Sequence, residues 1–290
     1  MLISLEGNIG SGKTTFLRIL GQRLGDLLPG VEIIVVQEPV EDWLVEFGET
    51  GSILGNLGND VNRWAMTFQH NAFITMFRLF REHKAKERTT NQVVIFERSV
   101  FSSRKVFAEV LHERGSMNEM EWAIYLDWFH YFAEEICFDG HIYLRTDVNE
   151  CCQRARERGR EADSSLPRDY LHALETRHDE WLMSEGGATT PRMRPIPVLK
   201  VDGHQPFHQD EPAISGLLDQ IVGFVKDLQD EIMLEQDIVN GSSADDEDES
   251  GADNESDDNE PIACVEDDSA DEATSRLFDS LPPLSTCNIS

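Results

Sequence analysis

The chain has 290 residues, of which 40% are apolar, and a formal net charge of −30. This length allows one large α/β domain with a full core. No run approaches the roughly 18 apolar residues of a membrane span. The acidic excess disfavours nucleic-acid binding, which needs a basic surface. The five cysteines lack metal-binding spacing, and a strand predicted from Leu2 leaves no room for a signal or transit peptide, so we expect a cytoplasmic protein with reduced thiols and no membrane contact.

A glycine-rich loop follows the first predicted strand, Leu2–Glu6. Its sequence, G-N-I-G-S-G-K-T at 7–14, matches the phosphate-binding P-loop pattern G-x-x-x-x-G-K-[ST]. Glycines let backbone N–H groups wrap a polyphosphate, Lys13 would reach the β- and γ-phosphates, and Thr14 would ligate Mg²⁺. The apolar positions that follow have helical spacing, which places a helix N-terminus against the phosphates. We therefore predict an ATP site made of Gly7, Asn8, Ile9, Gly10, Ser11, Gly12, Lys13, Thr14 and Thr15.

Continuous apolar runs alternate with helical patterns through the rest of the chain. Strands are predicted at 32–37, 92–96, 141–145 and 197–201, and helices at 62–81, 117–138, 151–160, 167–183 and 214–234, with a connector at 186–191. Such runs indicate a five-stranded parallel sheet flanked by helices, the P-loop NTPase fold, whose ligands bind at the carboxyl ends of the strands. From about residue 237 the composition becomes acidic and serine-rich. We therefore predict a folded domain over 1–236 and a disordered acidic tail over 237–290.

Charged side chains follow the second and third predicted strands. Glu38 lies after the second strand and is a candidate base for a hydroxyl that attacks the γ-phosphate. After the third strand, Glu97 can hold Mg²⁺ directly or through water, and Arg98 can neutralise charge on the transferred phosphoryl group. A surface ion pair is the common explanation for one such residue, but three of them at neighbouring strand ends favour a catalytic site.

Four arginines lie within seven residues at 154–160, and Arg154 and Arg158 share a helix face. In a P-loop protein this acidic, the pattern favours a lid over about 151–168 that delivers guanidinium groups to the phosphoryl group. A solvated basic helix or a nucleic-acid patch is the alternative.

Seven motifs resemble the deoxyribonucleoside kinase family, in family order across roughly residues 1–225. They are G-N-I-G-S-G-K-T-T at 7–15, E-P-V-E-D-W at 38–43, R-W-A-M-T-F-Q at 63–69, E-R-S-V-F-S-S-R at 97–104, M-N-E-M-E-W at 117–122, R-A-R-E-R-G-R at 154–160 and R-H-D-E-W-L at 177–182. The resemblance implies transfer of the γ-phosphoryl group of ATP, with Mg²⁺, to the 5′-hydroxyl of a deoxyribonucleoside in nucleotide salvage. It also favours a homodimer through the aromatic-rich helices at 62–81 and 117–138. The acidic tail has no counterpart in it, and its partner is unknown.

The resemblance also implies residue roles. Glu38 takes the 5′-hydroxyl proton, with Arg98 beside that hydroxyl and Lys13 at the phosphates. Gln69 pairs with the base edge through an amide that offers one donor and one acceptor. Further contacts are expected from Trp43, Phe68, Ala72, Met76, Ser103 and Phe107 around the nucleoside, from Arg154, Arg158 and Arg160 of the lid, and from Asp163 on the sugar 3′-hydroxyl.

Three positions depart from the pattern of the family that the chain resembles. Gly58 stands where the family carries a tyrosine for the 3′-hydroxyl, and Met76 and Ser103 stand where members tuned to deoxycytidine and purines carry an Arg and an Asp. Residues like these resemble the multisubstrate, pyrimidine-preferring branch, so we expect thymidine and deoxycytidine as substrates. Two alternatives remain open. One is a thymidylate-type nucleoside monophosphate kinase, which would be expected to show Asp-Arg at 97–98, and the other is a degenerate kinase whose tail is an interaction module.

Overall fold

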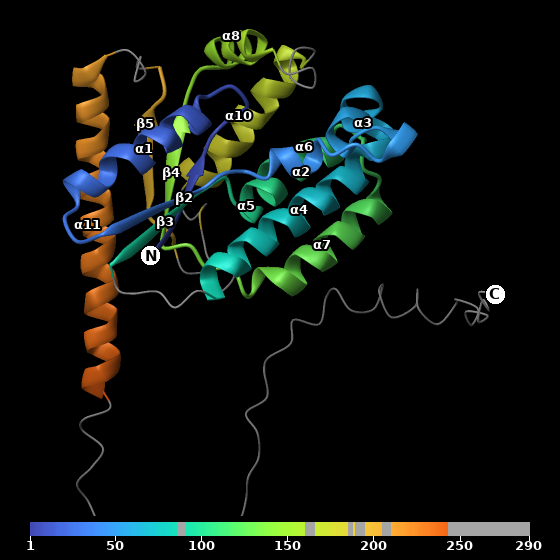
Figure 1. Ribbon diagram of the computed structural model, residues 1–290. Coiled ribbons are helices and arrows are strands. Elements are labelled where there is room, and N and C mark those ends of the chain that lie inside the picture. Colours follow the sequence, from blue (N-terminus) through green and yellow to red (C-terminus); the bar gives the residue numbers. More distant parts are fainter. Residues whose placement is uncertain (86–90, 160–165, 185–187, 189–194, 205–209, 243–290) are drawn as a thin grey trace, which may run out of the picture. The chain divides into compact units, whose positions relative to one another are not determined.

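The computed structural model describes residues 1–85, 91–159, 166–184, 188, 195–204 and 210–242 (Figure 1). Contacts within the chain define a compact unit, Met1–Asn240, and a second unit, Gly241–Ser290, of which the first two residues are described. The expected connector at 186–191, apart from Ala188, and the tail beyond Ser242 lie outside the described residues. In the described ranges, no helix combines the length and the apolar character that crossing a membrane requires.

Five parallel strands form one sheet in the order β2-β3-β1-β4-β5, which confirms the predicted fold. The strands are β1 (Leu2–Glu6), β2 (Glu32–Val36), β3 (Gln92–Glu97), β4 (Gly140–Arg145) and β5 (Val198–Asp202). Leu5 of β1 pairs with Glu97 of β3, and Val36 of β2 pairs with Phe96. The carboxyl ends of β1, β2 and β3 therefore lie side by side. They are followed by the P-loop, Glu38 and Arg98, respectively.

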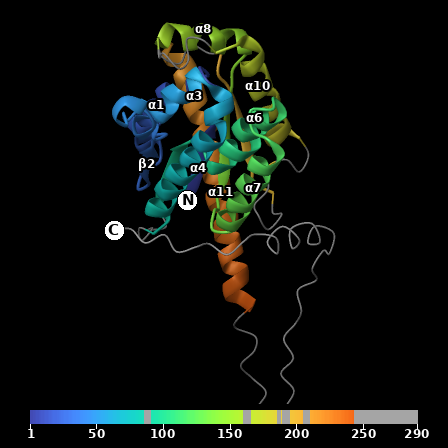
Figure 2. The ribbon, with the colours of Figure 1, turned by 90° about the vertical axis from the view of Figure 1, so that its right-hand side faces the viewer.

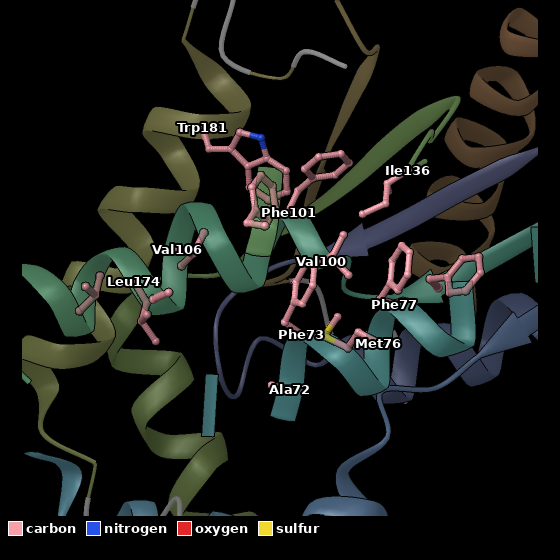
Figure 3. Close-up of a cluster of buried hydrophobic side chains, with 14 of the residues drawn as sticks. Ala72, Phe73, Met76, Phe77, Val100, Phe101, Val106, Ile136, Leu174 and Trp181 are labelled. Atoms are coloured by element: carbon pink, nitrogen blue, oxygen red, sulfur yellow. The ribbon is translucent and has the colours of Figure 1, made fainter. Parts of the chain in front are cut away.

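Helices cover both faces of this sheet (Figures 1 and 2). Alternate residues of each strand point to opposite faces, so Ile3 and Leu5 join one buried cluster and Leu2 joins the other. The first cluster includes α1 (Lys13–Leu27) and α11 (Glu211–Ser242). The second, part of which is shown in Figure 3, includes α4 (Val61–Ala85), α7 (Glu119–Ala133) and α10 (Arg168–Met183). Phe73, Phe77, Tyr125 and Phe129 belong to the second cluster, so part of the aromatic surface of the helices predicted at 62–81 and 117–138 is core.

All five helices whose bounds were predicted differ from those bounds: α4 (Val61–Ala85) extends beyond 62–81 at both ends, α10 begins one residue late, and the other three helices differ as follows. α7 begins after Asn118, whose side chain accepts hydrogen bonds from the next turn, and it ends at Ala133 rather than at 138. α8 (Val148–Arg158) starts earlier than predicted because Asp147 caps it, and it stops at Gly159, which has a φ of 68°. α11 extends beyond both predicted ends and continues past residue 237 to Ser242.

Six short elements were not predicted from the sequence, because a segment of three to seven residues contains too few positions to show a period. They are α2 (Val40–Trp43), the 3₁₀ turn η1 (Gly48–Thr50), α3 (Ile53–Asn59), α5 (Val100–Ser102), the π-helical turn η2 (Ser103–Ala108) and α6 (Glu109–Glu113). Several of them supply walls of the site described next. A π-helical turn is unusual and often occurs at a functional site.

Candidate active site

A cavity of about 1380 Å³ lies where β1, β2 and β3 end. It brings together most of the predicted site residues: Ile9, Gly10, Gly12, Lys13, Thr14, Thr15, Glu38, Trp43, Phe68, Gln69, Ala72, Met76, Glu97, Arg98, Ser103, Phe107, Arg154 and Arg158. Gly7, Asn8 and Ser11 are buried in the P-loop and are not among its described lining. Arg160 and Asp163 lie outside the described residues.

The P-loop follows β1 and leads into α1. Gly7 has a φ of 152°, and a Cβ there would lie 2.7 Å from the carbonyl oxygen of Leu144, so only glycine fits. Gly12 precedes α1 with a φ of 98°, and the first turn of this helix has no acidic side chain to compete for its N–H groups. These donors and the helix dipole can therefore bind a phosphate group.

Lys13 is buried beneath the loop. Its Nζ donates to the carbonyl oxygens of Gly7, at 2.9 Å, and Asn8, at 2.7 Å. Burial and the nearby charge of Arg98 lower the pKa of Lys13 to about 7. A polyphosphate in the cavity would favour the charged lysine, so phosphate binding and protonation of Lys13 are coupled.

Thr14 and Glu97 place two oxygen ligands side by side, since the Thr14 hydroxyl donates to Glu97 Oε1 at 2.7 Å. A hydroxyl and a carboxylate are groups that Mg²⁺ prefers. Among the described residues, no cluster of three His, Cys, Asp or Glu side chains could hold a metal ion by itself. The donor set therefore fits an Mg²⁺ ion that arrives with a nucleotide and takes its other oxygens from phosphate or water.

Arg98 and Glu38 form a buried ion pair, with 2.6 Å between Nη1 and Oε2. Arg98 has a φ of 63°, a strained value for a residue other than glycine, which is a common feature of active sites. Its guanidinium carbon lies 4.8 Å from the ring centre of Phe107. Burial opposes the charge of Arg98, but the carboxylates of Glu38 and Glu97 outweigh that effect and raise the pKa of the guanidinium. The group therefore stays cationic beside the P-loop.

A buried carboxyl group at the end of β1 supports the backbone behind Arg98. Glu6 Oε1 accepts hydrogen bonds from Ser99 Oγ at 2.6 Å and from Ser4 Oγ at 2.8 Å. Burial raises the pKa of Glu6, and its other carboxyl oxygen has no hydrogen-bond partner among the described residues. Because Ser99 also caps α5, this network holds the turn that carries Arg98. Sequence reasoning missed Glu6, although a charged residue within an apolar strand was a signal.

Gln69 lies at the other end of the cavity, on α4, and is 2% exposed. The Ser103 hydroxyl donates to Gln69 Oε1 at 3.2 Å and lies 3.4 Å from the Tyr125 hydroxyl. Ala72 and Met76 follow along the same helix (Figure 3). A flat amide beside a thioether and a hydroxyl, with no charged side chain between them, is suited to an uncharged heterocycle.

Aromatic rings form the remaining walls around Gln69. Trp43 lies edge-on to Phe68, with 5.3 Å between ring centres, and its Nε1 donates to Thr75 Oγ1 at 2.9 Å. Phe107 approaches from η2. Flat apolar walls of this kind accommodate a base between them.

Comparison with known proteins identifies the family. The deoxynucleoside kinase family model matches residues 3–226. The chain belongs to this family. Deoxycytidine kinase 2 of Gallus gallus is 35% identical over 243 residues, which cover 77% of this chain and 89% of the relative. A probable deoxycytidine kinase of fowlpox virus is 35% identical over 228 residues, 78% of this chain and 88% of the relative. The human deoxycytidine kinase is 34% identical over 225 residues, 71% of this chain and 84% of the relative.

The predicted family and enzyme class are thus confirmed. The chain is a kinase that phosphorylates deoxyribonucleosides, and the family implies ATP as the phosphoryl donor. This assignment sets aside both alternatives drawn from the sequence, a monophosphate kinase and a degenerate kinase.

In this kinase, α8, the described first part of the predicted lid, is attached to the P-loop. Arg154 Nη1 donates to the carbonyl oxygens of Ser11, at 3.1 Å, and Gly203, at 3.0 Å, while its Nε binds Glu150. Arg158 lines the cavity one turn further along α8. Arg154 therefore connects α8 to the P-loop and to the residue that follows β5.

Sequence reasoning missed several lining residues of the kinase. They come mainly from the short helices and from α10: Leu54, Leu57, Leu111, Arg114, Ser116 and Tyr170. Their positions depend on how α3, α6 and α10 pack, and no local pattern in the sequence shows this. Gly58, singled out as a family difference, lines the same cavity.

Proposed function

We propose that this kinase phosphorylates both pyrimidine deoxyribonucleosides, thymidine and deoxycytidine, at the 5′-hydroxyl, with ATP and Mg²⁺, in nucleotide salvage. One observation carries the pyrimidine assignment: the edge of the cavity around Gln69 includes a hydroxyl at Ser103 and a thioether at Met76, both of them uncharged groups. In the proposed pose, the base contacts Gln69 and stacks on Phe107.

The phosphoryl transfer then falls to groups at the strand ends. One oxygen of Glu38 is paired with Arg98. The other can accept the proton of the 5′-hydroxyl as the 5′-oxygen attacks the γ-phosphorus, while the bond between that phosphorus and the β,γ-bridging oxygen breaks and ADP leaves. Arg98 and Lys13 offset negative charge on the phosphates, and the backbone N–H groups of the P-loop hold them. When bound, Mg²⁺ would be held by Thr14 and Glu97 and would neutralise phosphate charge.

Selection between the two pyrimidines depends on the amide of Gln69. Cytosine presents an acceptor at N3 and a donor at C4, whereas thymine presents the reverse, so one amide must turn over to serve both. The Ser103 hydroxyl permits this because it can donate to the amide oxygen, as it does in the structure, or accept from the amide nitrogen. An arginine and an aspartate at positions 76 and 103 would fill this edge and fix the pattern.

The test is an assay with radiolabelled ATP and the four deoxyribonucleosides. We expect turnover of thymidine and deoxycytidine above that of the purine nucleosides. The joint change Met76→Arg with Ser103→Asp should lower kcat/KM for thymidine more than for deoxycytidine, on the order of 10²-fold, because steric exclusion and unpaired polar groups act together. Both changes are needed, since either alone buries an unpaired charge. An unaltered thymidine-to-deoxycytidine ratio in the double variant would remove the basis for the pyrimidine assignment.

We also propose a cytoplasmic homodimer that associates through α4 and α7. One side of α7 exposes large apolar residues at roughly helical spacing: Met120, Ile124, Trp128 and Tyr131. Trp128 meets His70 of α4 edge-on, so the two helices share this surface. Covering such a patch with its symmetry copy is the common way to remove it from water.

A further inference from the structure

Tyr170, in the first turn of α10, lines the nucleoside cavity. Burial raises the pKa of its phenol to about 12, so the hydroxyl is protonated at neutral pH. Among the described residues the phenol has no hydrogen-bond partner, and its oxygen is not one of the fully buried unpaired atoms. Because tyrosine hydroxyls inside proteins usually find a partner, this one has an unused hydrogen bond to offer to a ligand.

The packing of α10 against η2 places Tyr170 in the wall of the cavity that Phe107 of η2 also lines. Tyr170, Leu174 and His178 are four residues apart and therefore share one face of the helix. His178 meets the ring of Phe107 edge-on, with 6.4 Å between ring centres. Phe107 carries the guanidinium of Arg98 on its face, and the ring of Tyr170 carries that of Arg114, with 5.4 Å from the guanidinium carbon to the ring centre. Tyr170 therefore lines the same cavity as Phe107 and Arg98, from the helix that packs against η2.

The short helix α3 gives the cavity a wall that offers no polar side chain. Gly58 lines the cavity, and no atom lies within 4 Å of the position that its Cβ would take. Leu54 and Leu57, on the same helix, are apolar. Between the base and the 5′-hydroxyl of a deoxyribonucleoside lies the sugar, whose one other hydroxyl is at C3′.

We propose that Tyr170 binds this substrate through a hydrogen bond between its phenol and the 3′-hydroxyl of the sugar. The inference rests on the proposed pose, with the base at Gln69 and the 5′-hydroxyl at Glu38. A phenol both donates and accepts, so it can complement a hydroxyl in either direction. The bond exists for every substrate with a 3′-hydroxyl, whichever base it carries.

The test compares substrates that differ in this one hydroxyl. Tyr170→Phe should lower kcat/KM for thymidine and deoxycytidine roughly three- to tenfold, the effect of one neutral hydrogen bond. For 3′-deoxythymidine and 2′,3′-dideoxycytidine the same change should alter kcat/KM by less than about twofold, because the bond is absent from the start. Tyr131→Phe is the matched control: Tyr131 belongs to the proposed dimer surface of α7 and does not line the cavity, so any change in kcat/KM should be equal for the two substrate pairs.

Two results would overturn the inference. An equal loss with both kinds of substrate would mean that the phenol supports the fold or the lid, and no loss with either would mean that it does not contact the sugar. Glu38→Gln, measured alongside, tests the pose itself. If Glu38→Gln abolishes turnover while Tyr170→Phe does not discriminate, the inference fails and the proposed function stands. If Glu38→Gln leaves turnover unchanged, the proposed pose fails.

Discussion

Replacing Gly7 by alanine tests whether the shape of the P-loop is set by its backbone. The φ of 152° is a conformation that alanine adopts at a cost of roughly 1–3 kcal/mol. The added Cβ would lie 2.7 Å from the carbonyl oxygen of Leu144, where ordinary contact begins at 3.4 Å, so the loop and β4 must separate. Overpacking of this kind typically costs about 1–3 kcal/mol more. We therefore expect Gly7→Ala to lower the free energy of unfolding by about 2–6 kcal/mol, and Tm by roughly 5–20 °C.

The same change should damage catalysis beyond its effect on stability. The Gly7 carbonyl oxygen accepts from Lys13 Nζ at 2.9 Å and lies 3.5 Å from a nitrogen of Arg98. A shift of the loop therefore moves two cations that face the phosphates. We expect kcat/KM at a temperature where the variant is folded to fall on the order of tenfold to 10²-fold, in line with the cost of small misplacements at reacting centres.

Gly223→Ala is the matched control. Gly223 lies on the exposed side of α11, and no atom lies within 4 Å of the position of its Cβ, so alanine should stabilise the helix by about 0.5–1 kcal/mol. The two variants, compared by denaturant unfolding and by the radiolabelled ATP assay, should therefore move in opposite directions in stability. If Gly7→Ala unfolds and turns over like wild type, the P-loop geometry described here is not what sets phosphate binding.

Three further predictions concern single residues. Glu38→Gln removes the proton acceptor but keeps the shape, so kcat should fall about 10²–10⁴-fold in steady-state assays, and near wild-type turnover would exclude Glu38 as the base. Because the pKa of Lys13 is lowered from 10.5 to about 7, ATP binding above pH 7 must be accompanied by protonation of this lysine. Calorimetry in buffers of different ionisation enthalpy should show uptake of about one proton, and the affinity for ATP should fall about tenfold per pH unit. The Lys13→Met variant should show neither effect. The same pKa shift affects folding. The unfolded chain binds the Lys13 proton more tightly than the folded chain, so the contribution of Lys13 to the free energy of unfolding rises between pH 7 and 10.5. Trp128→Glu should shift sedimentation from dimer to monomer at micromolar concentration, whereas a wild-type protein that is already monomeric would contradict the homodimer.

The phosphate end of the site was predictable because its parts are contiguous in the sequence. Lys13 and Thr14 have fixed positions relative to Gly7, and the strand before them and the helix after them are both visible as apolar patterns. Glu38 and Arg98 were predictable for a related reason, since parallel strands that end in polar residues bring those residues to one edge. The structure adds contacts that a sequence pattern does not predict, such as the 2.6 Å ion pair between Glu38 and Arg98.

The rest of the site depends on contacts between distant segments. Ser103 donates a hydrogen bond to Gln69, which is 34 residues away in the sequence. Ser103 lies in a π-helical turn, which no periodicity in the sequence predicts. Tyr170 reaches the cavity because α10 packs along η2, and a single tyrosine in an amphipathic helix gives no sign of this. Glu6 had a signal, a charge in an apolar strand, but its partner Ser99 lies on another strand end.

The phosphate end and the base end of the site differ in how much substitution they tolerate. In the proposed function, the groups that bind phosphate are backbone donors and the side chains of Lys13 and Arg98, beside the base Glu38, and the backbone of Gly7 and Arg98 tolerates little change. The groups proposed to contact the base are side chains alone, and the residue at position 103 determines which orientations the Gln69 amide can take. A hydroxyl at 103 can donate or accept, whereas a carboxylate there could only accept and would hold the amide in one orientation. A kinase on this scaffold can therefore change its nucleoside by altering positions such as 76 and 103 while the chemistry at the strand ends stays the same.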